Sequence, residues 1–185
     1  MIVLGLSGSL RTHSYNRRLL DAAAAALPEG VSLDVYGGLA DLPPYNDDVE
    51  SVETPAAVHA LREAIARADA VLVATPEYNS SMPGLLKNAL DWASRPFPAN
   101  ALRGKPVAVV GASTGLFGAV WAQAETRKVL EAIGATVIDE ELPVGQAHQA
   151  FAADGSLVDR DVNAALVALV SKVVEAARPR ACQSA

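Results

Sequence analysis

The chain has 185 residues and a formal net charge of −6, because 15 lysine and arginine residues stand against 21 aspartate and glutamate residues. With an acidic balance and no basic run, neither nucleic acid nor an anionic membrane is an expected partner. Hydrophobic residues make up 51% of the chain and charged residues 19%, which argues against a disordered chain. The length predicts one domain over residues 1–185.

Cysteine content and the apolar runs predict the cellular location. The one cysteine, Cys182, has no partner for an internal disulfide bond, which suits a reducing compartment. The first apolar run, residues 2–6, is too short for a secretory signal, and no run reaches the roughly 18 apolar residues of a membrane span. We therefore expect a soluble cytoplasmic protein. No group of His, Cys and carboxylate residues has metal-ligand spacing, so no metal is expected.

Five short runs predict β-strands. Residues 2–6, 70–74 and 107–111 are almost continuously apolar, which is typical of strands buried on both faces of a parallel sheet. Residues 31–35 and 135–139 contain polar as well as apolar side chains, and this mixture predicts strands at the edges of the sheet. Apolar residues at three- and four-residue spacing predict helices between them. The last helix has its apolar face at Val162, Leu166, Leu169 and Val173, and Pro179 is expected to end it.

Strand and helix thus alternate five times, with the second and fifth strands at the edges. The flavodoxin-like strand order 2-1-3-4-5, a three-layer α/β sandwich with a five-stranded parallel sheet, satisfies this pattern. The Rossmann order 3-2-1-4-5-6 would instead place the apolar third strand at an edge. In such sheets a ligand binds at the carboxyl ends of the strands, near the first and third. The segments after strands one, three and four are therefore the candidate site.

The segment after the first strand, residues 7–17, combines hydroxyl side chains, Arg11 and the start of a helix. Backbone N–H groups at a helix start attract anions, and an arginine can bind two oxygens at once. This combination predicts a site for a phosphate monoester. The P-loop pattern and the G-x-G-x-x-G pattern are both absent, which argues against a nucleoside triphosphate or a buried pyrophosphate. The alternative is that these residues only cap the helix.

The other two segments have the composition of ligand loops. After the third strand, Pro76 and Pro83 stiffen a loop whose backbone amides suit the polar edge of a planar heterocycle. Glu77 in this loop could be a general base, although the sequence has no partner carboxylate or histidine at a suitable spacing. After the fourth strand, Gly111, Gly115 and Gly118 allow close approach of backbone to a ligand.

Three motifs in these segments resemble the NADPH-dependent FMN reductase family, which includes chromate, quinone and azo-dye reductases. The first is Gly8-Ser9-Leu10-Arg11-x-x-Ser14-x-Asn16. The second is Thr75-Pro76-Glu77-Tyr78-Asn79-x-Ser81-x-Pro83-Gly84-x-Leu86-Lys87-Asn88-Ala89-x-Asp91-Trp92, and the third is Ser113-x-Gly115-x-x-Gly118. The resemblance runs from Ile2 to about the fifth strand, and the long middle motif is its most specific part.

The resemblance implies FMN as cofactor and NADPH or NADH as electron donor. The residues implied for the FMN phosphate are Ser9, Leu10, Arg11, Ser14, Tyr15 and Asn16. Those implied around the isoalloxazine are Pro76, Glu77, Tyr78 and Asn79, with Ser113, Thr114 and Gly115 on its far side. The family is commonly dimeric or tetrameric, with the helix over residues 87–92 at the interface. Ala119 stands where the family often has glycine and is expected to narrow the approach to the ring.

The predicted function is an FMN-dependent NAD(P)H oxidoreductase that passes a hydride to a small acceptor with ping-pong kinetics. No catalytic side chain is expected, because the flavin does the chemistry. The alternatives are a flavodoxin-like electron carrier without NAD(P)H oxidase activity, a Rossmann-type dehydrogenase, and a scaffold without catalysis. The sequence leaves open whether the acceptor is a flavin, a quinone, chromate or an azo compound. It also leaves open the roles of His148 and of residues 45–48, which are interpreted as a surface loop.

Overall fold

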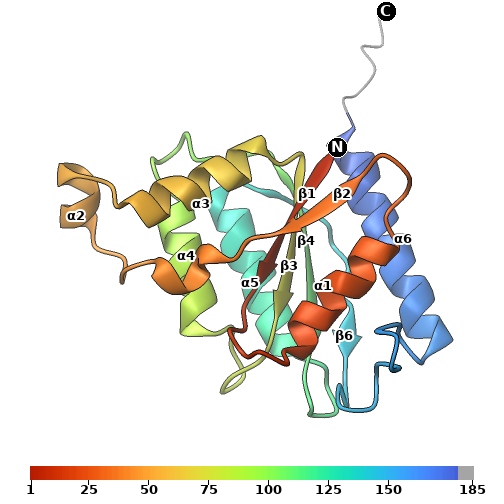
Figure 1. The fold of residues 1–185 in the computed structure, drawn as a ribbon. Helices are drawn as coiled ribbons and strands as arrows, with labels where there is room; N and C mark the ends of the chain where they lie inside the picture. The colour runs from red at the N-terminus through yellow and green to blue at the C-terminus, as the bar shows by residue number, and fades with distance from the viewer. Residues whose placement is uncertain (179–185) are drawn as a thin grey trace, which may run out of the picture.

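The computed structural model describes residues 1–178, so Pro179 and Cys182 lie outside the described part. A parallel sheet in the order β2-β1-β3-β4-β5 lies between two layers of helices (Figure 1). The strands are β1 (Ile2–Ser7), β2 (Ser32–Val35), β3 (Ala70–Thr75), β4 (Pro106–Ala112), β5 (Thr136–Val137) and β6 (Pro143–Val144). The flavodoxin-like strand order predicted from the sequence is confirmed.

The helices divide between the two faces of the sheet. They are α1 (Tyr15–Ala25), α2 (Asp47–Val52), α3 (Ala56–Arg67), α4 (Gly84–Ala93), α5 (Val120–Ile133) and α6 (Arg160–Ala177), with a 3-10 helix, η1, at Gly38–Asp41. Helices α1 and α6 cover one face, and α3, α4 and α5 cover the other (Figure 1). Within residues 1–178, no helix is both long enough and apolar enough to cross a bilayer.

The central strands are apolar throughout because each contributes to two cores. In β1, Leu4 and Leu6 pack under α3 and α4, whereas Val3 packs under α1 and α6. Every residue of β3 is buried. The edge strand β2 alternates exposed and half-buried residues, as its mixed sequence predicts.

The fifth position of the sheet differs from the prediction of one strand over residues 135–139. It is shared by β5, which pairs with the start of β4, and β6, which pairs in parallel with Gly111 and Ala112 at the end of β4. The acidic segment 139–141 separates the two. The prediction of five strands was therefore wrong by one, because β6 has only two residues and no apolar run marks it.

The interpretation of residues 45–48 as a surface loop was also wrong, because helix α2 begins at Asp47. The Asn46 side chain accepts a hydrogen bond from the Asp48 N–H (2.9 Å) and caps the helix. Glu50 forms a bidentate ion pair with Arg62 of α3, with N–O distances of 2.9 and 2.7 Å. The helix projects from one side of the molecule (Figure 1) and is joined to α3 by the Glu50–Arg62 pair.

The loop after β4 packs tightly against β6. Gly118 has a φ of +57°, a left-handed conformation, and a Cβ there would lie 2.4 Å from the carbonyl carbon of Pro143. Backbone surrounds this position, so no flexible side chain can move aside. The glycine is therefore required for the loop and β6 to meet.

We predict that Gly118→Ala lowers the free energy of unfolding by about 2–5 kcal/mol, through left-handed strain and overpacking. Urea denaturation of the purified variant measures the change. Gly37→Ala is the matched control, because its φ of −94° suits alanine and nothing lies within 4 Å of a Cβ there. It is expected to stay within about 0.5 kcal/mol of wild type. Equal stability of both variants would contradict the packing described.

Candidate functional site

A cleft of about 110 Å³ opens at the carboxyl edge of the sheet, between the segments that follow β1, β3 and β4. Ten of the thirteen residues predicted for the site line it: Ser9, Arg11, Ser14, Tyr15, Asn16, Pro76, Glu77, Tyr78, Ser113 and Thr114. The remaining three, Leu10, Asn79 and Gly115, do not line it, although each adjoins a residue that does. The structure thus brings together residues from three motifs that are far apart in the sequence.

The start of α1 faces this cleft with unused hydrogen-bond donors. The Ser14 hydroxyl caps the helix by accepting from the Arg17 N–H (3.2 Å). Within residues 1–178, the N–H groups of Tyr15 and Asn16 have no acceptor, and the Arg11 guanidinium has no ion-pair or hydrogen-bond partner. Free N–H groups at a helix start carry partial positive charge, so the cleft suits an anion such as a phosphate.

The Asn16 side chain fixes where α1 starts. Its Oδ1 accepts from the Ala112 N–H (2.9 Å), and its Nδ2 donates to the Ala112 carbonyl (3.0 Å). Asn16 is only 3% exposed, so both side-chain groups are used within the protein. The side chain therefore positions the helix, while the backbone N–H of Asn16 has no acceptor within residues 1–178.

The aromatic ring of Tyr15 packs against the segment that follows β6. It stacks on Phe151, with ring centroids 6.2 Å apart and planes within 10° of parallel. The Arg18 guanidinium lies 4.7 Å from the Phe151 ring centroid and donates to the Ala152 carbonyl (3.0 Å). The first turn of α1 is thus anchored on two sides.

The loop after β3 is a tight turn. The N–H of Tyr78 donates to the Ser81 carbonyl (3.0 Å), and the N–H of Ser81 donates back (3.2 Å). Asn79 and Ser80 between them have φ values of +55° and +61°, which is typical of a two-residue hairpin turn. A Cβ on Gly8 would lie 3.0 Å from Pro76, so this glycine lets the β1 and β3 segments approach.

Two carboxylates hold this loop against α5. Glu77 accepts from the N–H groups of Trp121 (3.1 Å) and Ala122 (3.2 Å), which caps the start of α5. Glu125 on α5 accepts from the Ser81 hydroxyl and from the Met82 N–H (3.2 Å). Because Glu77 is engaged by a helix start, the interpretation of it as a general base is not favoured.

The loop after β4 is held by the segment that follows β6. Ser113 accepts at its carbonyl from the Ala147 N–H (3.0 Å), and Gly115 accepts from the Gln146 N–H (2.9 Å). Ala119, at the end of this loop, is 1% exposed with a φ of +62°. Its methyl group is therefore buried and does not line the cleft, which disfavours the prediction that Ala119 narrows the approach to the ring.

The residues of the long middle motif that lie on α4 hold a neighbouring segment of the chain in place. Asn88 of α4 accepts from the Tyr45 N–H (2.8 Å) and donates to the Pro43 carbonyl (3.0 Å). The indole of Trp92 is fully buried and donates to the same carbonyl (2.7 Å). Lys87 and Asp91, on the outer side of α4, pair with each other at 2.8 Å. The motif thus holds the segment that leads into α2.

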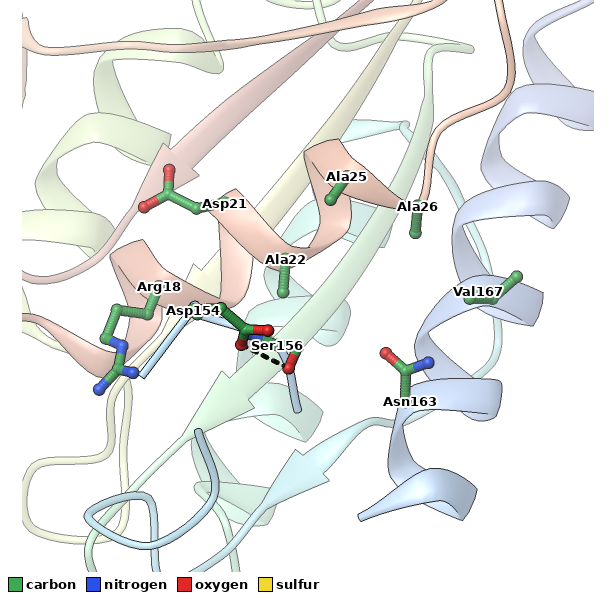
Figure 2. A pocket seen from close by; sticks show the side chains of 10 residues that line it. Arg18, Asp21, Ala22, Ala25, Ala26, Asp154, Ser156, Asn163 and Val167 are labelled. Carbon is green, nitrogen blue, oxygen red and sulfur yellow. Dashed lines mark hydrogen bonds between the residues drawn. The ribbon is translucent and has the colours of Figure 1, made fainter. Parts of the chain in front are cut away.

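A larger cleft of about 460 Å³ lies elsewhere, between α1 and α6 (Figure 2). Small side chains from the alanine run of α1, among them Ala22 and Ala25, leave this hollow unfilled. On its rim Asp154 accepts from the Ser156 hydroxyl (2.7 Å), and this bond lowers the pKa of Asp154. None of the predicted site residues lines it, so size does not identify the functional site here.

Several residues that hold the cleft in place were not predicted from the sequence. Ala112 lines the cleft, and Gln123, Glu125 and Gln146 support its loops. Polar residues on α5 resemble a solvated helix face in the sequence, so no local signal marks them. The left-handed φ of Gln146 (+46°) also carries no sequence signal, because the residue is not glycine or asparagine.

Known proteins with a similar sequence or structure are flavin-dependent reductases and quinone reductases. The family model described as NADPH-dependent FMN reductase matches residues 1–149. An NAD(P)H-dependent FMN reductase of Pseudomonas aeruginosa is 46% identical over 158 residues, which is 85% of this chain and 84% of that protein. A 2-hydroxy-1,4-benzoquinone reductase of a Burkholderia species is 37% identical over 174 residues, 94% of each. The solved structure of FerB, a flavoenzyme NAD(P)H:(acceptor) oxidoreductase of Paracoccus denitrificans, superposes with a TM-score of 0.84 at 38% identity, over 95% of this chain and 96% of that one.

The chain belongs to the NADPH-dependent FMN reductase family. It is an oxidoreductase that uses FMN and NAD(P)H, and the family assignment favours this over the flavodoxin-like electron carrier. The fit of FMN can be tested against the cleft itself. The N–H groups at the start of α1 and the Arg11 guanidinium, which have no partner in the described part of the chain, suit its phosphate, so the residues present fit the cofactor.

We predict that Asn16→Ala destabilises the protein even without cofactor, by about 1–3 kcal/mol, because it leaves buried groups of Ala112 unpaired. Urea denaturation of cofactor-free protein tests this. Asn163→Ala is the matched control, since Asn163 is an exposed asparagine on α6 and should stay within about 0.5 kcal/mol. An unchanged stability of Asn16→Ala would show that its side chain is not part of the fold.

Proposed function

We propose that the cleft at the carboxyl edge holds the phosphate of FMN. The residues proposed to contact it are Ser9, Leu10, Arg11, Ser14, Tyr15 and Asn16, the last through its backbone N–H. The observation that carries this proposal is a pair of N–H groups at the start of α1 that share the cleft with Arg11; among residues 1–178, neither these groups nor the Arg11 guanidinium has a partner. The hydroxyl groups of Ser9 and Ser14 add donors that carry no charge.

The isoalloxazine is proposed to lie at the open rim of the cleft. A volume of about 110 Å³ is well below the roughly 300–1,000 Å³ that buries a ligand of this size, so the ring must extend outside it. The backbone of Pro76, Glu77, Tyr78 and Asn79 would bound one side of the ring, and Ser113, Thr114 and Gly115 the other. The rigid anchoring of both loops supports this arrangement.

Bound FMN supplies the redox chemistry, since a flavin can take two electrons from NAD(P)H and give them to a second substrate. The protein's own residues bind and orient. Ser14 and Asn16 fix the start of α1, where the phosphate is proposed to bind. Glu77 and Glu125 fix the loop after β3, which is proposed to bound the isoalloxazine, relative to α5. No side chain is assigned a proton transfer. Since the ring lies at an open rim, donor and acceptor are expected to use the same face in turn, with ping-pong kinetics.

A quinone is the acceptor that we propose. The Burkholderia relative is named for 2-hydroxy-1,4-benzoquinone, and the chain and that relative cover 94% of each other. Free flavin, chromate and azo compounds are the other acceptors that the sequence left open. The same open rim would admit either NADPH or NADH.

We further propose a homodimer or homotetramer that works in the cytoplasm. Helix α2 supports association, because it projects from the body (Figure 1) and exposes Val52 by 88% and Val49 by 39%. The outer face of α4, proposed for the interface, offers the Lys87–Asp91 pair. Static light scattering of the purified protein gives the subunit number, and a monomeric mass would refute this part.

The activity is tested by loading the purified chain with FMN and following NADPH and NADH oxidation with 1,4-benzoquinone. We expect FMN-dependent oxidation and parallel double-reciprocal plots when both substrates are varied. A protein that binds FMN but oxidises neither nicotinamide would support the electron carrier instead.

Arg11→Ala is predicted to weaken FMN binding by about ten- to a hundredfold, because a charge-assisted contact is worth about 1.5–3 kcal/mol. Quenching of FMN fluorescence by the protein measures the affinity. Arg17→Ala is the matched control, because Arg17 pairs with Asp21 (3.1 Å) on the same helix. It should leave FMN affinity within about twofold of wild type. Equal affinity of Arg11→Ala and wild type would show that the segment is only a helix cap.

A further inference from the structure

Exposed apolar side chains gather around the proposed flavin rim. Among the large apolar residues that are exposed, Leu10, Tyr78, Leu116, Phe117 and Trp121 all belong to the three site segments or to the first turn of α5. Large apolar patches on a protein surface mark places where something binds. The proposed cofactor contacts account for Leu10 and Tyr78 but leave the other three without a role.

Phe117 and Trp121 form an aromatic pair at this rim. Their ring centroids are 5.2 Å apart with planes at 68°, an edge-to-face arrangement. Phe117 is 60% exposed and Trp121 is 49% exposed, so each ring shields only part of the other from solvent. Leu116, 71% exposed, precedes them. We call these three side chains the aromatic platform.

The platform stands on a rigid base. The backbone N–H of Trp121 donates to Glu77, which belongs to the loop after β3. The Gly118 carbonyl accepts from Gln123 (3.0 Å), a side chain with 0% exposure, and the Gly115 carbonyl accepts from Gln146. The rings are therefore exposed on a fixed backbone that is joined to the cleft through Glu77, one of its lining residues.

The patch is narrow, which favours a small ligand over a second protein. Three side chains of this kind expose on the order of 300 Å² together, whereas a stable protein interface buries about 800 Å² per partner. It does not continue down α5, because the next exposed positions include the charged Glu125, which is already bound to the β3 loop. Aromatic rings on a fixed base are suited to stacking on another planar ring.

We propose that the aromatic platform binds the planar aromatic electron acceptor and makes the enzyme prefer it over acceptors that cannot stack. This inference rests on the proposed function and adds the residues that select the acceptor class. Trp121 and Phe117 are specificity-determining residues in it. They contact the acceptor and take no part in holding FMN.

The test compares 1,4-naphthoquinone with ferricyanide, an inorganic acceptor without a ring, on FMN-loaded protein with NADPH. The ratio of kcat/KM for the quinone over ferricyanide should fall about tenfold in Trp121→Ala, by the size of a stacking contact. Trp121→Phe keeps a ring and should restore most of the ratio. Phe97→Ala is the matched control, since Phe97 is 68% exposed but precedes β4, at the other end of the sheet, beside Arg103.

A binding measurement separates this inference from the proposed function. Trp92 has 0% exposure and Trp121 is half-exposed, so the quenching of tryptophan fluorescence by added naphthoquinone, without NADPH, is assigned to Trp121 by the part of it that is lost in Trp121→Phe. Saturable quenching supports the platform even if no acceptor is turned over, which would refute the function alone. The inference is overturned if the acceptor ratio is unchanged in Trp121→Ala, or if naphthoquinone does not quench saturably. It is also overturned if Trp121→Ala lowers the mass seen by light scattering, since the platform would then be a subunit interface.

Discussion

The site depends on one pair of hydrogen bonds, between the Asn16 side chain and both backbone groups of Ala112. They tie the first turn of α1 to the end of β4 and so bring the positive end of a helix to the point where β1, β3 and β4 end. A helix start placed there attracts an anion without any buried charge of its own. The asparagine that the motif assigns to the ligand is thus used to build the proposed phosphate site.

Acidic residues act in a comparable way on the other side of the cleft. Glu77 and Glu125 connect the β3 loop with α5, and both accept hydrogen bonds from backbone N–H groups. Rigid loops matter here because a flavin enzyme relies on its cofactor for chemistry and on the protein for position. Asn16, Glu77 and Glu125 therefore hold the segments around the cleft in fixed positions.

The sequence predicted the sheet order and most of the residues that line the cleft, because both follow from local patterns. Strands buried on both faces are continuously apolar, and motif residues cluster where such strands end. Helix α2 could not be predicted, since its support comes from Arg62, twelve residues beyond Glu50. The roles of Asn16 and Glu77 also escaped, because their partners lie 96 and 44 or 45 residues away in the chain. Long-range pairing of this kind leaves no periodicity to detect.

Amide NMR of the labelled protein, with FMN compared against riboflavin, tests the placement of the phosphate most directly. Riboflavin has the same ring and lacks the phosphate. If the start of α1 holds that group, FMN shifts the amide signals of Tyr15 and Asn16 strongly, while riboflavin at equal saturation leaves them near their ligand-free positions. Equal shifts with both ligands, or shifts confined to residues such as Asn163 in the cleft between α1 and α6, would contradict the account.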